Sequence, residues 1–162
     1  MKLSEGVEWT IHCCSVLGAL PPAATISGTR LAEFHGVPPP YLVKQLQKLS
    51  QAGIVEATTG RAGGYRLARP ARDITLRDIV LALEGDEPAF RCTEIRQQGP
   101  TSVDAPRYAL PCGIARAMWQ AEDAWRSELA AVSIADINRE LAATVDPLQL
   151  DKAIEWFQVV LQ

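Results

Sequence analysis

The chain has 162 residues, of which 48% are hydrophobic and 22% charged. This composition excludes collagen-like, purely coiled and fully disordered proteins. Four cysteines are too few for a disulfide scaffold. The net charge of -3 excludes a uniformly basic nucleic-acid binder. However, residues 30–77 carry eight Lys/Arg against three Asp/Glu, a local charge of +5, whereas residues 85–162 carry seven against twelve, a local charge of -5. Only the first of these segments suits a polyanion.

Residues 9–24 carry no charged side chain, so this stretch could be mistaken for a signal peptide or a membrane span. Glu5 and Glu8 stand where a signal peptide needs positive charge. The stretch is also too short to span a membrane, and Pro21-Pro22 interrupt it. We therefore expect a cytoplasmic protein with reduced cysteines, which are then candidates for ligands or sensors.

Three helices are predicted in the first third of the chain. Apolar residues recur every three or four positions from Leu3 to Leu17, which is typical of one helix face. A second helix fits residues 29–35. A third begins at Pro39-Pro40, since proline is tolerated in a first helical turn, and it runs to Ala52.

Two short strands and a fourth helix follow. Residues 54–58 and 65–67 read as strands around a glycine-rich tip, and residues 75–83 as a helix. Three helices followed by such a hairpin define a winged helix-turn-helix. The predicted fold class is mainly α with a small two-stranded β wing, plus a long dimerisation helix.

The second half begins with an irregular loop over residues 86–111, with one turn expected around 93–98. A long helix over 113–132 follows, and its apolar seam is expected to pair with a second copy of the chain. The seam comprises Ile114, Met118, Ala121, Trp125, Leu129 and Val132. A capping box at Ser133 predicts a further helix, and Asp146-Pro147 opens the last one, whose Trp156, Phe157 and Val160 should pack back.

We accordingly divide the chain into three parts. Residues 1–85 form the winged helix-turn-helix domain, residues 86–112 a cysteine-containing loop, and residues 113–162 the dimerisation helix and C-terminal helices. No internal repeat was found.

The third helix is the candidate recognition helix, because the second helix of a helix-turn-helix motif enters the major groove. It is expected to present Tyr41, Lys44 and Lys48 outward, where lysines can meet phosphates or guanine edges. Arg61 at the wing tip suits a minor groove. These features also fit a winged helix used for protein contact, with the lysines on a solvated face.

Several motifs carry a resemblance to a known family. The segments "LSQAGIV", "GGYRLARP" and "ITLRDIV" resemble the bacterial Rrf2 family of winged-helix regulators, whose members include IscR and NsrR. The resemblance is specific over residues 1–85 and extends to the later architecture. It implies a homodimeric transcription factor, usually a repressor, that binds a dyad operator in double-stranded DNA.

The cysteines depart from the pattern of many family members, in which three closely spaced cysteines bind an iron–sulfur cluster. Here Cys92 and Cys112 stand alone, and two thiolates are too few for a cluster. Glu8 and His12 are four residues apart, so they leave one side of the first helix together. A carboxylate, an imidazole and two thiolates complete a set of four, which suggests that the ligands meet across a dimer.

One branch of the family shows this arrangement. The segments "MKLSEGVEWTIHCC" and "FRCTEIRQQGP" are similar to the redox-sensing regulator RsrR of actinobacteria. The resemblance implies a [2Fe-2S] cluster held by Glu8, His12, Cys92 and Cys112, with Trp9 as the aromatic switch beside it. Such a ligand set suits reversible one-electron sensing, and a His or Glu ligand can couple the electron to a proton.

Three alternatives stay open from the residues. Cys92 and Cys112 could form a disulfide under oxidant, or the same four residues could hold zinc. An enzyme is disfavoured, because the chain has only two histidines and no phosphate-binding loop. Cys13 and Cys14 read as packing residues.

Overall fold

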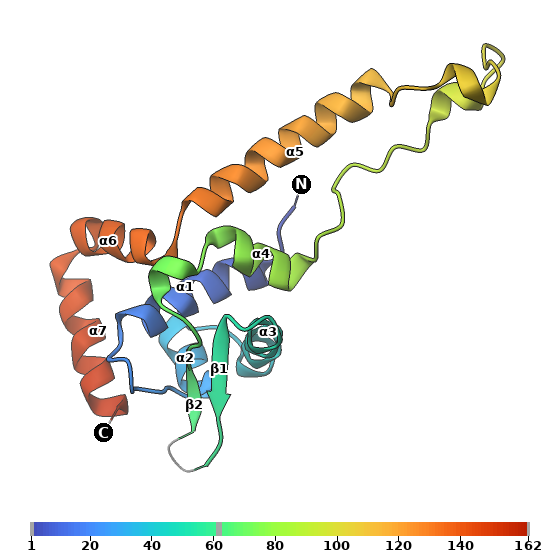
Figure 1. The fold of residues 1–162 in the computed structure, drawn as a ribbon. Coiled ribbons are helices and arrows are strands. Elements are labelled where there is room, and N and C mark those ends of the chain that lie inside the picture. Colours follow the sequence, from blue (N-terminus) through green and yellow to red (C-terminus); the bar gives the residue numbers. More distant parts are fainter. Residues whose placement is uncertain (1, 61–62, 162) are drawn as a thin grey trace.

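The computed structural model describes residues 2–60 and 63–161, which fold into a body and a projecting arm (Figure 1). Its helices and strands are α1 (Glu5–Ala19), α2 (Gly28–His35), α3 (Pro39–Gln51), β1 (Val55–Thr58), β2 (Gly64–Leu67), α4 (Leu76–Glu84), α5 (Gly113–Ala131), α6 (Ile134–Thr144) and α7 (Pro147–Val160). Each predicted helix and strand is present, with ends that differ by a few residues at most. None of the described helices is long and apolar enough to cross a membrane.

The wing is a two-stranded antiparallel sheet in which Val55 pairs with Leu67 and Thr58 with Gly64. Ile26, just before α2, extends this pairing through two backbone hydrogen bonds with Tyr65, of 2.8 and 3.2 Å. Gly64 is required here, because a Cβ atom at this position would lie 2.6 Å from the main chain of Ile26. The predicted DNA contact Arg61 lies outside the described residues.

The core of the body forms where α1, α2, α3 and α4 meet. Leu31, Leu42 and Leu46 are completely buried there, and burial of a side chain of this size is worth about 1.5–3 kcal/mol. Cys13 and Cys14 are also completely buried, as expected of packing residues. Burial raises the pKa of the Cys13 thiol to about 12 and raises that of Cys14 further, so both thiols stay protonated.

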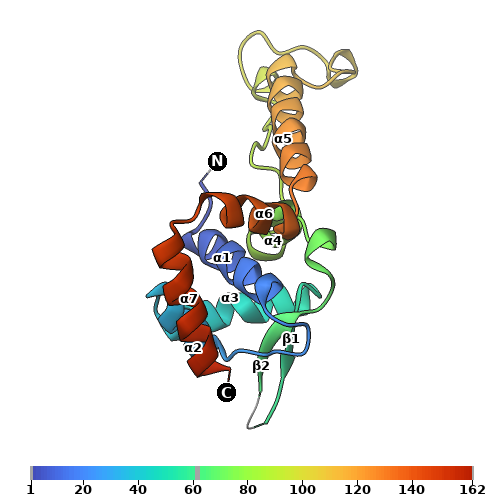
Figure 2. The same ribbon diagram turned by 90° about the vertical axis from the view of Figure 1, so that its left-hand side faces the viewer.

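The C-terminal helices return to the body, where α6 packs on α1 and α7 lies beside α2 (Figure 2). The start of α6 is tied to the start of α4, since Ile134 N–H donates to the Ile74 carbonyl at 2.9 Å. On α7, the rings of Trp156 and Phe157 lie 5.1 and 4.8 Å from that of Phe34. The prediction that these two aromatic residues pack back is confirmed.

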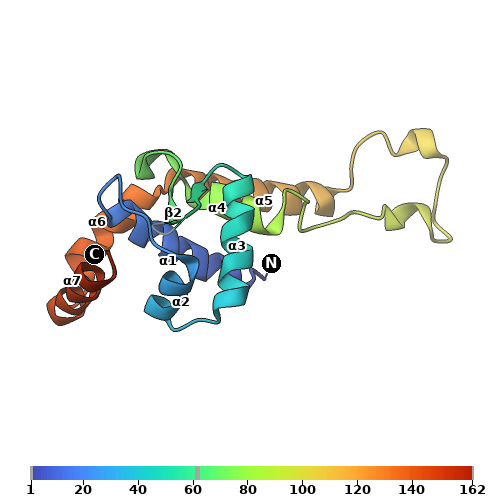
Figure 3. The same cartoon turned by 90° about the horizontal axis from the view of Figure 1, so that it is seen from below.

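The arm consists of the loop after α4 and the N-terminal half of α5 (Figure 1). The expected turn around residues 93–98 is present as a 3-10 turn at Ile95–Gln97, and a second turn lies at Ala105–Arg107. Seen from below, the two limbs of the loop separate widely before they rejoin near the tip (Figure 3).

The predicted seam of α5 divides between two environments. Trp125 and Leu129 pack against the core of their own chain, because this half of α5 lies on α4. Ile114 and Met118, in the arm, are 68% and 45% exposed. Part of the C-terminal half of the seam is therefore covered within the chain, whereas the arm half is uncovered among the described residues, and pairing of the seam with a second copy stays a prediction.

Candidate DNA-binding surface and metal-ligand residues

The outward face of α3 carries two of the predicted DNA contacts. Tyr41 is 47% exposed, and Lys44 is exposed one turn later with no hydrogen bond or ion pair to any described residue. The buried face of the same helix holds Leu42, Leu46 and Leu49. This division fixes α3 on the body and leaves its polar side available to a partner, as a recognition helix requires.

Lys48 differs from the expectation that it points outward. Its side chain is half-buried, and its Nζ donates a 3.1 Å hydrogen bond to the carbonyl oxygen of Leu83. That carbonyl belongs to the last turn of α4, where unpaired carbonyls attract a cation. Lys48 therefore joins α3 to the end of α4 in this structure.

Ion pairs neutralise much of the basic segment. The guanidinium groups of four arginines pair with neighbouring carboxylates: Arg30 with Glu33, Arg66 with Glu56, Arg69 with Asp78, and Arg72 with Asp73. Among the described residues of this segment, Lys44 and Arg77 have no carboxylate partner. Lys48 has none either, but it contacts the Leu83 carbonyl. The local charge of +5 is thus concentrated in fewer side chains than the sequence count indicates.

Glu8 and His12 share one exposed face of α1, as their spacing predicts. Both line an open pocket of about 440 Å³, together with Leu3, Ser4, Glu5, Val7 and Ile11. Neither side chain has a hydrogen bond or ion pair in the part of the chain that is described. A carboxylate and an imidazole are thus presented side by side at the surface.

His35 lies behind this face and was missed by the sequence analysis. Its ring centroid is 5.7 Å from that of His12, and its Nε2 atom is buried with no hydrogen-bond partner among the described residues. Burial, and then the neighbouring His12, lower the pKa of His35 to about 4, so the ring is neutral at neutral pH. The available signal was that the chain contains only these two histidines.

Trp9 connects the same region of α1 to the recognition helix. Its ring meets that of Tyr41 edge to face, with centroids 5.3 Å apart. One turn along, a Cβ atom added to Gly6 would lie 3.0 Å from the side chain of Gln45 on α3. The two helices are therefore in close contact at the predicted ligand residues.

Cys92 belongs to the loop after α4 and Cys112 directly precedes α5, and this arm extends away from α1 (Figure 1). Both are free and half-buried, and Cys112 is the N-cap of α5. Across residues 2–60 and 63–161 of one chain, no three His, Cys, Asp or Glu side chains form a group that could hold a metal ion. A single copy therefore brings Glu8 and His12 together but does not join them to the cysteines.

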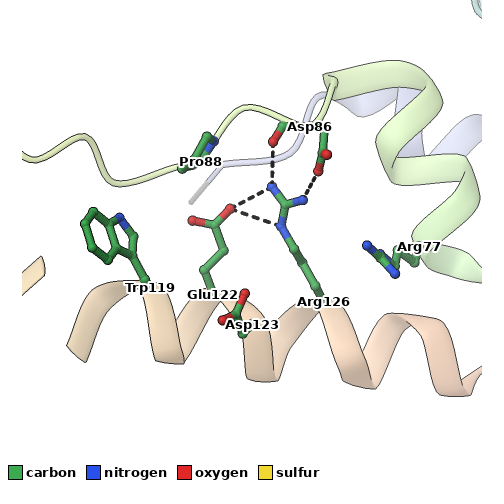
Figure 4. Close-up of a pocket in the computed structure, with 7 residues that line it drawn as sticks. All are labelled: Arg77, Asp86, Pro88, Trp119, Glu122, Asp123 and Arg126. Atoms are coloured by element: carbon green, nitrogen blue, oxygen red, sulfur yellow. Dashed lines mark hydrogen bonds and ion pairs between the residues drawn. The ribbon is translucent and has the colours of Figure 1, made fainter. Parts of the chain in front are cut away.

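The base of the arm contains a polar network centred on Arg126 (Figure 4). Its guanidinium donates to Glu122 at 2.8 and 3.1 Å, pairs with the carboxylate of Asp86, and donates to the Asp86 carbonyl at 3.2 Å. The hydrogen bonds that Arg126 donates to Asp86 and Glu122 raise the pKa of Arg126 above its ordinary value. Arg77 and Trp119 line the pocket around this network.

Comparisons with known proteins give the class of protein that this fold represents. A family model described as "Rrf2: Iron-dependent Transcriptional regulator" matches residues 3–140. YffB of Lactococcus lactis subsp. lactis, which bears the name of an HTH-type transcriptional regulator, is 32% identical over 157 residues, covering 96% of this chain and 98% of YffB. The chain therefore belongs to the Rrf2 family of transcriptional regulators.

Two solved structures share the fold. CymR, the global cysteine regulator of B. subtilis, superimposes with a TM-score of 0.67 at 22% identity and covers 86% of this chain and 98% of CymR. IscR of T. potens gives a TM-score of 0.66 at 22% identity and covers 90% of this chain and 93% of IscR. The predicted class, mainly α with a two-stranded wing, is thereby confirmed.

Proposed function

We propose that this Rrf2-type regulator is a DNA-binding homodimer whose operator affinity follows the redox state of a [2Fe-2S] cluster. The ligands would be the set that the resemblance to RsrR implies, with Glu8 and His12 from one copy and Cys92 and Cys112 from the other. The observation that carries the proposal is the separation of the donors. One chain presents an oxygen and a nitrogen donor on α1, and two thiols on an arm that extends away from it (Figure 2).

The residues present fit such a group. Two thiolates, an imidazole and a carboxylate supply the four protein ligands that a [2Fe-2S] cluster needs. Beside His12, the buried and unpartnered Nε2 of His35 provides a polar neighbour for a ligand ring. When bound, the cluster supplies a reversible one-electron centre, and nitrogen ligation raises its reduction potential relative to all-cysteine ligation.

The arm supports ligation between copies. Its exposed residues Ile95, Leu110, Ile114 and Met118 are apolar and have no cover within the described chain. A second copy of the chain is the occupant that also completes the ligand set. We assign residues 86–112 and the exposed half of α5 to the cluster loop and dimer contact, and residues 1–85 to DNA binding.

Contacts between α1 and α3 provide a direct route from the ligands to DNA. Trp9 follows Glu8 in the chain and touches Tyr41 at the start of the recognition helix. A shift of α1 when the charge at Glu8 and His12 changes would reach Tyr41 and Lys44 through this ring pair. The same route supports the role of Trp9 as the switch. The role of the protein as a repressor at a dyad operator is proposed from the family resemblance alone.

A thiol switch without a cluster is the second candidate. Cys92 and Cys112 are half-buried and free, and they lie on opposite limbs of one loop, where a disulfide would tie the limbs together. The fold is shared equally with CymR and with IscR, at 22% identity each, so the fold favours neither candidate over the other. A zinc site with the same four ligands would be colourless, but the protein would then bind zinc in a fixed stoichiometric ratio.

Anaerobic purification tests these candidates, with visible absorption, iron, sulfide and zinc analysis. We expect two irons and two sulfides for each set of four ligands. The oxidised and dithionite-reduced protein should then differ in affinity for an operator selected from random DNA. Equal affinity in the two states would remove redox control, and a colourless protein that responds to a thiol oxidant would establish the disulfide switch.

A mixed dimer tests ligation between copies. One chain carries Glu8→Ala and His12→Ala, the other Cys92→Ala and Cys112→Ala, and the heterodimer is isolated with two affinity tags. If ligands come from both copies, the heterodimer retains one complete set and half of the wild-type iron. Ligation within one chain would leave it without iron.

A further inference from the structure

The outgoing limb of the arm is fastened to α5 by a stripe of three side chains, Trp119, Glu122 and Arg126. Their spacing of three and four residues places them on one face of the helix. Figure 4 shows all three directed toward the chain that leaves α4. The stripe contacts three main-chain atoms of this limb, and Arg126 also pairs with the carboxylate of Asp86.

Three hydrogen bonds connect the stripe to consecutive points of that limb. Arg126 donates to the Asp86 carbonyl at 3.2 Å. Glu122 accepts from the Ala89 N–H at 3.0 Å, and the indole N–H of Trp119 donates to the Phe90 carbonyl at 3.3 Å. The side chains of Arg126 and Glu122 are only 17% and 10% exposed.

The last of these bonds lies two residues before Cys92. An extended chain spans at most about 3.5 Å per residue, so the α-carbon of Cys92 stays within about 7 Å of that of Phe90, whose carbonyl is held by the Trp119 indole on α5. Cys112 is the N-cap of the same helix. The positions of both cysteines are therefore fixed relative to the same helix, α5.

A second tie closes the arm beyond Cys92. The guanidinium of Arg96 donates to the Leu110 carbonyl at 3.2 Å, two residues before Cys112. The same guanidinium lies 5.1 Å from the ring of Tyr108, whose hydroxyl donates to the Arg96 carbonyl at 3.0 Å. Cys92 thus lies between two points at which the outgoing limb is held.

We propose that Trp119, Glu122 and Arg126 are positioning residues that set the separation of the Cys92 and Cys112 thiols. Holding two thiolates at one distance before the metal arrives removes much of the entropic cost of closing the loop between them. The effect on cluster retention rests on the proposed function. The effect on the thiol separation does not, and it would equally serve a disulfide switch or zinc.

The variants that test this proposal remove contacts of the stripe. Trp119→Phe keeps an aromatic ring but loses the N–H donor, and Glu122→Leu loses the acceptor for both Ala89 and Arg126. Glu122→Gln keeps an oxygen acceptor and is the rescue variant. Gln120→Ala, an exposed position on the same helix with no hydrogen bond to a described residue, is the control.

The first measurement uses metal-free protein. Spin labels on Cys92 and Cys112 give their distance distribution, since the other two cysteines are buried. We expect a narrow distribution in wild type, Gln120→Ala and Glu122→Gln, and a broad one in Trp119→Phe and Glu122→Leu. An unchanged distribution in Trp119→Phe overturns the proposal, even if Glu122→Leu fails to fold.

The second measurement uses loaded protein and separates the two proposals. Iron release should be about tenfold faster in Trp119→Phe, as is usual when a supporting contact of a metal site is lost, and the visible circular dichroism should change. A wild-type protein that takes up no cluster, yet shows the expected distance distributions, contradicts the proposed function alone. A stable cluster with unaltered circular dichroism and release in both bond-deleting variants contradicts the positioning role alone.

Discussion

The body and the arm are built on opposite principles. In the body, α1 to α4 bury their apolar faces against one another, and even two cysteines are enclosed. The arm leaves Ile95, Leu110 and Ile114 between 68% and 74% exposed and holds its shape by polar ties to main-chain atoms. The body buries its apolar faces within a single copy, whereas the arm leaves apolar side chains uncovered among the described residues, and we propose that a second copy covers them.

On the proposed function, the largest expected effect is the loss of the cluster from the arm. Cys92→Ala removes one of two thiolates, and the remaining three donors cannot retain both irons. We expect iron and visible absorption to fall to background while the body stays folded. The control is Thr93→Ala, at the exposed neighbouring position. Iron analysis measures the cluster and circular dichroism measures the fold. Iron at the wild-type level in Cys92→Ala would exclude Cys92 as a ligand.

Truncation of a side chain should affect the body far more than the arm. Leu46→Ala creates a cavity at a completely buried site and should cost about 2–5 kcal/mol of unfolding free energy. Ile95→Ala, at a site 74% exposed, should cost less than about 0.5 kcal/mol in dilute protein. Urea unfolding of both variants checks the contrast, and similar midpoints would show that the arm has a core of its own.

A charge on the exposed half of α5 should separate the two copies. Met118→Asp places a carboxylate on the unpaired apolar surface and should weaken dimerisation by about tenfold or more. Val159→Asp, equally polar and 75% exposed on α7, is the matched control. Sedimentation over a range of concentrations gives the dimer affinity. If only Val159→Asp dissociates, the dimer contact lies on α7 instead of the arm.

Removal of Lys44 should weaken DNA binding by the body without changing assembly. If Lys44 neutralises one phosphate, Lys44→Ala lowers the slope of log affinity against log salt by about one. Lys152→Ala, an exposed lysine on α7, controls for net charge. Fluorescence anisotropy at several salt concentrations measures the slope. A changed sequence preference with an unaltered slope would show that Lys44 reads a base.

The smallest effect is expected where the arm helix rejoins the body. Ser133 caps α6, and its side chain accepts from the N–H of Asp136 at 3.2 Å. Ser133→Ala should cost about 1 kcal/mol of unfolding free energy, the usual value for an N-cap. Ser127→Ala, exposed within α5, should change little. Thermal unfolding compares the two, and equal stability would mean that α6 does not depend on its cap.

Periodicity and local signals were sufficient for the helices and the wing. Prolines and capping residues act on the nearest turn of chain, so the starts of α3, α6 and α7 could be read from neighbouring residues. The shared face of Glu8 and His12 follows in the same way from helical spacing. The assignment of the four ligands came from the family resemblance, because their positions in the chain lie too far apart for any local rule.

The contacts between distant segments depended on how the helices pack. Lys48 looks like a free lysine in the sequence, yet α3 crosses α4 where the Leu83 carbonyl is unpaired. The seam of α5 looks continuous in the sequence, yet Trp125 and Leu129 pack against the core of their own chain. His35 beside His12 and Trp119 beside Phe90 are likewise invisible to spacing rules. The spacing of residues along a helix specifies which side of it each residue occupies. Which neighbour lies on that side depends on the free energy of packing the whole chain.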